Sequence, residues 1–215
     1  MIYLRAYSTY FAIGTQFNYS ESQAYKIINQ VINFLIDSKL FIKNQDADFF
    51  QLNAHSEYII DVTECTIQRP KYNQKEYYSG KKKHTIKIQL LINKESNAII
   101  IYDLDSGSVY DFELFKKTSD KFRKDITVLA DSGYQGIKNI IPEAVIPHKK
   151  PKNKDLDEQQ KAFNKNLSSK RVIIENVNRK LKIFKSIGLT YRSRIKEIVK
   201  IINLIVLIHN YELSV

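Results

Sequence analysis

The sequence predicts an α/β fold: a mixed β-sheet flanked by helices and preceded by a small all-α helix-turn-helix. Three observations indicate this fold. Apolar residues repeat at helical spacing near the N-terminus, short β-rich runs follow from residue 58, and helical patterns return in the last third of the chain. The composition shifts near residue 57, where the helical first segment gives way to the strand-like one.

The N-terminal segment reads as two helices joined by a tight turn. Residues 10–17 form the first helix, and Ser20 opens the second, because a hydroxyl followed three residues later by Gln23 has the form of a capping box. Apolar residues then follow at helical spacing: Ala24, Ile27, Ile28, Val31 and Leu35. In a DNA-binding unit this stripe would pack inward, and the helix would offer three residues to a DNA groove: Ser22, Gln23 and Lys26. Helix pairs of this kind also occur without DNA binding, and the net charge of residues 1–57, which is −1, counts against it.

The middle of the chain alternates strands with short helices. Strand patterns cover residues 58–62, 85–92, 98–102, 126–130 and 144–146, with a short helix over 111–119. Residues 149–167 are polar and rich in lysine, which predicts a loop or an insertion. A long helix is expected from Ser168 to about Ile183, and a last helix from about Ser193 to Tyr211.

Composition and charge limit the function classes. The chain has 215 residues, of which 43% are hydrophobic, so disorder is excluded as the main state. No apolar run reaches the roughly 20 residues that span a bilayer, no secretory signal is readable, and the lone Cys65, interpreted as a small buried hydrophobe, suits a reducing cytoplasm. The net charge is +11, and residues 149–200 carry 16 basic against 5 acidic groups. That segment predicts either a solvated surface or contact with nucleic acid.

Three acidic residues stand out as candidates for chemistry. Asp61 follows a buried run, Asp131 ends a strand before a glycine-containing turn, and Glu175 interrupts an apolar helix face. Each alone is explained by a strand-end cap, a turn or a salt bridge. Together, hard carboxylate oxygens without His or Cys partners suit Mg²⁺ or Mn²⁺. The four histidines have no metal-ligand spacing, so zinc is not expected.

These residues lie in motifs that resemble bacterial insertion-sequence transposases of the DDE superfamily, in the IS-five-like branch. The matching segments are residues 60–65, 69–70, 77–85 and 129–136. The match continues in the last third of the chain, where Arg171, Glu175 and Lys182 have the spacing of the right half of the Tyr-Arg-Glu-Lys signature. The sequence departs from the family pattern at Ser168, where the signature tyrosine is expected, and at Tyr110, where relatives often have His before Asp.

The resemblance implies a ribonuclease-H-like catalytic domain over residues 58–212, after a helix-turn-helix segment over 1–45 that looks short at its N-terminus. Asp61, Asp131 and Glu175 would meet in space and hold two divalent ions, Mg²⁺ or Mn²⁺, for phosphodiester cleavage at element ends and strand transfer into target DNA. Phosphates near the scissile bond would contact Arg171 and Lys182, and the DNA backbone would run along Lys81, Lys82, Lys83 and the run 149–154.

The partners implied are the element ends, the target DNA and further copies of the chain on DNA, in a bacterial cytoplasm at the nucleoid and not at a membrane. Two other classes stay open. One is a truncated, catalytically inactive transposase remnant that acts only as a DNA-binding protein. The other is a ribonuclease-H-like nuclease that cuts without joining.

Overall fold

A computed structural model describes residues 1–38, 52–54, 56–152 and 155–214. Five strands form one sheet: β1 (Glu57–Thr66), β2 (Thr85–Asn93), β3 (Ile99–Ser106), β4 (Thr127–Leu129) and β5 (Ala144–Val145). Their order is β3-β2-β1-β4-β5. The β1–β2 and β2–β3 pairs are antiparallel, and the β1–β4 and β4–β5 pairs are parallel. The predicted mixed sheet is confirmed, and it places β1 at the centre.

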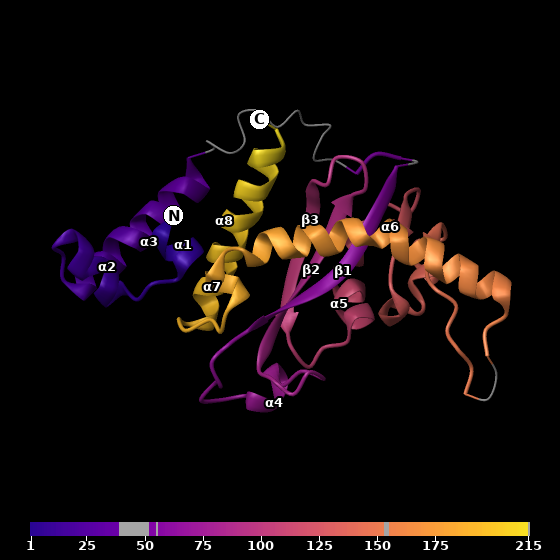
Figure 1. Ribbon diagram of the computed structural model, residues 1–215, viewed down its shortest axis with the longest axis horizontal. Coiled ribbons are helices and arrows are strands. Elements are labelled where there is room, and N and C mark those ends of the chain that lie inside the picture. Colours follow the sequence, from indigo (N-terminus) through magenta and orange to yellow (C-terminus); the bar gives the residue numbers. More distant parts are fainter. Residues whose placement is uncertain (39–51, 55, 153–154, 215) are drawn as a thin grey trace.

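Helices precede, interrupt and follow the sheet (Figure 1). They are α1 (Ile2–Ala6), α2 (Tyr10–Phe17), α3 (Glu21–Asp37), α4 (Gln74–Tyr77), α5 (Asp111–Lys117), α6 (Glu158–Lys182), α7 (Lys185–Gly188) and α8 (Ile195–Leu213). Three single-turn 3₁₀ helices cover Ser119–Lys121, Ser132–Tyr134 and Ile137–Asn139. No helix in the described part of the chain has an apolar stretch long enough to cross a bilayer.

The prediction that residues 149–167 form a loop is wrong over its second half, because α6 begins at Glu158 and not at Ser168. A capping box starts the helix early. The Asp157 side chain accepts a hydrogen bond from the Gln160 amide at 2.7 Å, and the Gln160 side chain accepts one from the Asp157 amide. The first nine residues of α6 are mostly polar, with only Ala162 and Phe163 apolar, and none of them is buried, so they lack the apolar periodicity on which the prediction depended.

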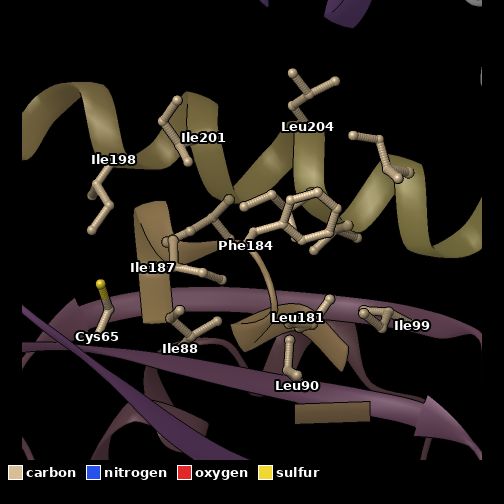
Figure 2. Packing of buried hydrophobic residues seen from close by; sticks show 14 of the residues in the cluster. Cys65, Ile88, Leu90, Ile99, Leu181, Phe184, Ile187, Ile198, Ile201 and Leu204 are labelled. Atoms are coloured by element: carbon tan, nitrogen blue, oxygen red, sulfur yellow. The ribbon is translucent and has the colours of Figure 1, made fainter. Parts of the chain in front are cut away.

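The sheet has a hydrophobic layer on each face. One layer joins the sheet to the end of α6, to α7 and to α8, and Figure 2 shows Cys65, Ile88 and Leu90 of the strands facing Leu181, Phe184 and Ile187. The other layer packs α5 and the 3₁₀ helices on the opposite face, through Tyr58, Ile60, Phe115, Tyr134 and Ile137. Cys65 is fully buried, which confirms its interpretation as a small hydrophobe. Strand β1 therefore alternates between two covered faces.

The N-terminal helices pack on α8, which lies between them and the sheet (Figure 1). The predicted helix pair and the capping box at Ser20 are confirmed, with Asn18 in the left-handed region at φ 58° closing α2. Gly14 is required at the turn, because a Cβ there would lie 2.6 Å from the carbonyl oxygen of Tyr19.

The prediction that the whole apolar stripe of α3 packs inward is wrong. Ala24 and Ile32 are buried, whereas Ile27 and Val31 remain 39% and 49% exposed, because α8 covers only one side of α3. The three residues predicted to face DNA are exposed: Ser22, Gln23 and Lys26. The side-chain oxygen of Gln23 is held in the capping box.

Candidate active site

Asp61 lies in the middle of β1 and not at its end, as the sequence had suggested, because the strand continues to Thr66. Its side chain points to the face covered by α6. There Oδ1 accepts a hydrogen bond from Arg171 Nη2 at 3.1 Å, and Oδ2 accepts one from Asn178 Nδ2 at 3.0 Å. The side chains of Asp61 and Arg171 are 21% and 17% exposed. Asp61 is thus a half-buried carboxylate with both oxygens held by one helix.

Asp131 lies beside Asp61 because of the parallel pairing of β1 with β4. Ile59 is paired with Leu129, so continuing the register by two residues brings Asp131 level with Asp61. Asp131 is extended, at φ −88° and ψ −177°, and its Oδ1 accepts a hydrogen bond from the Gly133 amide at 2.8 Å. The two carboxylates come from adjacent strands at the centre of the sheet.

A third carboxylate, Asp111 at the start of α5, lies on the other side of Gly133. A Cβ placed on Gly133 would be 2.9 Å from Asp131 Oδ1 and 3.1 Å from Asp111 Oδ2. A side chain at this position would push against both carboxylates, so glycine leaves the space between the two acids open. Lys87 of β2 compensates part of the charge, with its Nζ 2.7 Å from Asp111 Oδ1.

The three carboxylates of this site, Asp61, Asp131 and Asp111, repel one another. Burial raises the pKa of Asp61 to about 6; the Arg171 guanidinium opposes this change, and the Asp131 and Asp111 carboxylates reinforce it. Burial also raises the pKa of Tyr134 well above its usual value, with further contributions from Asp111, Asp61 and Asp131. A tyrosine influenced by all three acids marks them as one electrostatic site, and a cation would relieve their repulsion.

Glu175 comes from α6, on the same side as the groups that hold Asp61. At about 100° per residue, four side chains of α6 fall within an arc of about 60°: Arg171, Glu175, Asn178 and Lys182. Glu175 is exposed, at the edge of this arc. Within the described residues, no three His, Cys, Asp or Glu side chains lie close enough together to hold one metal ion. Glu175 is therefore not grouped with Asp61 and Asp131 in this structure, in which Arg171 and Asn178 donate to the oxygens of Asp61.

The lysines predicted to contact DNA lie in two places, near the end of α6 and in the run 149–154. Lys182 is exposed at the end of α6, where partial desolvation lowers the pKa of its ammonium group and the charge of Lys81 lowers it further. Lys81 lies 3.4 Å from Glu64 Oε1, so the connection between β1 and β2 brings this lysine to α6. Lys82 and Lys83 are exposed next to it. Residues 153–154 of the predicted run 149–154 lie outside the described residues.

The sequence missed two residues of this site. Asn178 lies seven residues after Arg171, and helical spacing alone would have placed both on one side of α6. Asp111 had been noticed only as part of a departure from the family pattern. The role predicted for Arg171 was phosphate contact, whereas the structure places its guanidinium against Asp61.

A mixed sheet in the order β3-β2-β1-β4-β5, flanked by helices and with carboxylates on its two central parallel strands, defines a ribonuclease-H-like fold. Comparison with known proteins then gives the family. The model of the family described as DDE superfamily endonuclease matches residues 60–210. The chain is also 39% identical, over 214 residues, to a protein of Microchaete diplosiphon named probable transposase for insertion sequence element IS702. The alignment covers 99% of this chain and 78% of that relative.

The chain belongs to the DDE superfamily endonuclease family, which is a family of nuclease and transposase enzymes. Membership implies a DNA substrate and the use of divalent metal ions.

Proposed function

We propose that this chain is a DNA transposase that cleaves phosphodiester bonds at insertion-sequence ends and transfers the freed ends into target DNA. The observation that carries the proposal is the pair of carboxylates that the parallel β1–β4 pairing brings together, Asp61 within β1 and Asp131 two residues after β4, close enough for the charge of Asp131 to raise the pKa of Asp61. The near full-length similarity to a probable transposase supports the reaction class. Joining two DNA ends favours an assembly of at least two copies of the chain. Since its substrate is DNA, the protein would act at the nucleoid.

The residues present suit divalent metal ions. Asp61 and Asp131 offer hard oxygen donors, and their mutual repulsion is the kind that a bound cation relieves. The side-chain oxygen of Asn178, next to Asp61, is buried and has no hydrogen-bond partner in the described part of the structure, so an acceptor is left over at this site. Asp61 and Asp131 would hold Mg²⁺ or Mn²⁺, with Glu175 as the third ligand that the family resemblance implies. When bound, two such ions lower the pKa of an attacking water or hydroxyl and stabilise the leaving oxygen.

The other residues of the site bind and orient. Arg171 and Asn178 each donate to one oxygen of Asp61 from the same helix, so they fix its rotamer. Lys182, whose pKa is lowered by partial desolvation and by the charge of Lys81 and raised by that of Asp61, would bind a phosphate near the scissile bond together with Lys81. Lys82, Lys83 and the described part of the run 149–154 would contact the backbone more loosely. On the N-terminal helices, Ser22 and Lys26 are exposed for a DNA groove.

Two measurements test this proposal, and the first needs no knowledge of the element ends. Titration of Mn²⁺ by calorimetry is expected to show saturable binding to the wild type, lost in Asp61→Asn and in Asp131→Asn. Asp155→Asn is the matched control, since this side chain is 78% exposed and lies outside the site. Unchanged binding in both site variants would refute the metal assignment.

Nicking and strand-transfer assays then separate the reaction classes. A transposase is expected to join a pre-cut end to target DNA, with loss of both activities in Asp131→Asn. Cutting without joining would indicate a nuclease, and DNA binding with neither activity would indicate a remnant. Either result would overturn the proposal.

A further inference from the structure

The connection between β1 and β2, residues 67–84, forms a second charged surface outside the acidic site. It carries six basic residues and one acidic residue, so its net charge is +5. Residues 58–148 as a whole carry 14 basic and 12 acidic groups, so the acidic residues outside the connection nearly cancel its charge. In the structure the connection, which includes α4, extends from the end of the sheet (Figure 1).

This surface is hollowed and aromatic as well as basic. A pocket of about 380 Å³ is lined by Arg69, Gln74, Lys75, Tyr78 and His84. Its volume lies within the range of pockets that take small ligands. The ring of Tyr78 is 49% exposed, so it offers apolar area to solvent at the pocket.

The pocket is held in shape by local bonds. Tyr78 and His84 form an antiparallel bridge, and their rings meet edge to face at a centroid distance of 5.5 Å. Arg69 Nε donates to Gln74 Oε1 at 2.8 Å, which fixes the plane of the guanidinium group beside them. The ring and the guanidinium plane are thus set before any ligand binds.

The lysine turn beside the pocket is also held in a defined conformation. The Ser79 amide donates to the Lys83 carbonyl at 2.9 Å, and the Lys82 amide donates to the Ser79 carbonyl at 2.9 Å. Lys82 has φ 58°, in the left-handed region that glycine adopts more readily. The turn thus presents the Lys82 ammonium group to solvent beside the pocket.

We propose that this pocket binds one unpaired nucleotide of the DNA strand, with its base stacked on Tyr78 and its phosphates near Lys75 and Lys82. This inference rests on the proposed function and extends it. Lys81 of the same turn pairs with Glu64 of β1, on the strand that carries Asp61, so a strand leaving the acids along β1 would pass this lysine and reach the pocket. A base in a duplex shows only its edge, so stacking on the ring selects an unpaired nucleotide.

Fluorescence anisotropy with a labelled oligo-dT strand and a duplex of equal length tests the inference, in EDTA so that no cleavage interferes. Tyr78→Ala is expected to weaken single-strand binding roughly 5- to 150-fold, the equivalent of the ~1–3 kcal/mol of one base–aromatic stack. Duplex binding should change little. Tyr78→Phe keeps the ring and should bind as the wild type does. Lys82→Gly should keep or raise the melting temperature while lowering the salt dependence of binding.

Phe163→Ala is the matched control. This ring is 40% exposed and also meets a histidine, His148, edge to face at 5.0 Å, but it lies on α6 outside the pocket. Its ratio of single-strand to duplex affinity should equal that of the wild type. Equal affinities of Tyr78→Ala and Tyr78→Phe, or parallel losses for single strand and duplex, would overturn the inference.

The failure of this inference is distinguishable from that of the proposed function. Asp131→Asn should keep the single-strand preference, since the pocket does not include the acids. Metal-dependent cleavage by the wild type, together with unchanged binding by Tyr78→Ala, would refute the nucleotide pocket and leave the proposed function standing. A preference for single strands that depends on the Tyr78 ring, in a chain that neither binds Mn²⁺ nor cuts DNA, would refute the proposed function and leave the nucleotide pocket standing.

Discussion

Replacing Asp61 by Asn is expected to abolish cleavage and, in the absence of metal, to stabilise the fold. Burial and the charges of Asp131 and Asp111 raise the pKa of Asp61 from 3.8 to about 6, even though Arg171 opposes this. Between these two values the folded chain keeps a proton that the unfolded chain has released, so stability from this group falls as the pH rises. One pH unit corresponds to 1.36 kcal/mol, so the ionised carboxylate costs the folded state about 3 kcal/mol at pH 7.

Asn is neutral and nearly the same size, so Asp61→Asn should recover about 1–3 kcal/mol of this cost. For a chain of this length, each kcal/mol raises the melting temperature by roughly 2–4 °C. Thermal unfolding followed by circular dichroism at pH 7 in EDTA measures the change. Asp155→Asn, at an exposed carboxylate, should stay within about 0.5 kcal/mol of the wild type. A lower melting temperature for Asp61→Asn would refute the electrostatic reasoning.

Asp61→Asn should be more stable than the wild type without metal, and this difference should shrink or reverse when Mn²⁺ is added. At a Mn²⁺ concentration about 100 times the dissociation constant, binding stabilises the wild type by about 2.7 kcal/mol. Asp61→Asn lacks a ligand and should gain little. Equal stabilisation of both proteins by Mn²⁺ would show that Asp61 does not hold the ion.

Two further predictions concern the fold that supports the site. Leu90 is fully buried in β2, so Leu90→Ala should lower the free energy of unfolding by about 2–5 kcal/mol in urea titrations. The control is Leu189→Ala, at a residue that is 53% exposed, which should change the free energy of unfolding by less than about 0.5 kcal/mol. Burial and the charge of Lys180 lower the pKa of His209, and Glu212 opposes them, so the unfolded chain binds the proton first. Stability should therefore fall as the pH drops below about 6.5, and urea titrations at two pH values should show this loss in the wild type and not in His209→Gln.

The sequence predicted the elements better than their lengths. Strands and helices with clear apolar periodicity, such as β2 and α3, were found close to their true bounds. The start of α6 was missed because its first turns are polar, and the length of β1 was underestimated because Asp61 and Glu64 interrupt its apolar run. In both cases packing and capping in the folded chain override the composition of the segment.

Part of the candidate site could be predicted from the sequence, whereas its geometry, Asn178 and the role of Asp111 could not. The acids were found as carboxylates at unusual places and through the family resemblance. That Asp131 lies level with Asp61 follows from the β1–β4 register, and strand order across a sheet cannot be deduced from local patterns. Asp111 and Lys87 meet only because α5 packs on β2, so their ion pair is a product of the tertiary structure.

Asn178 gives a final prediction, since its side chain orients Asp61. Its Nδ2 donates to Asp61 Oδ2, and partners that orient a metal ligand typically contribute 10- to 100-fold to metal affinity. Asn178→Ala should therefore weaken Mn²⁺ binding by roughly that factor in calorimetry while leaving the number of sites unchanged. Asn176→Ala, at an exposed position of the same helix about 160° from Asn178, is the control and should bind as the wild type does. Equal affinities in the two variants would mean that the sheet alone orients Asp61, and that α6 serves the site only through its charges.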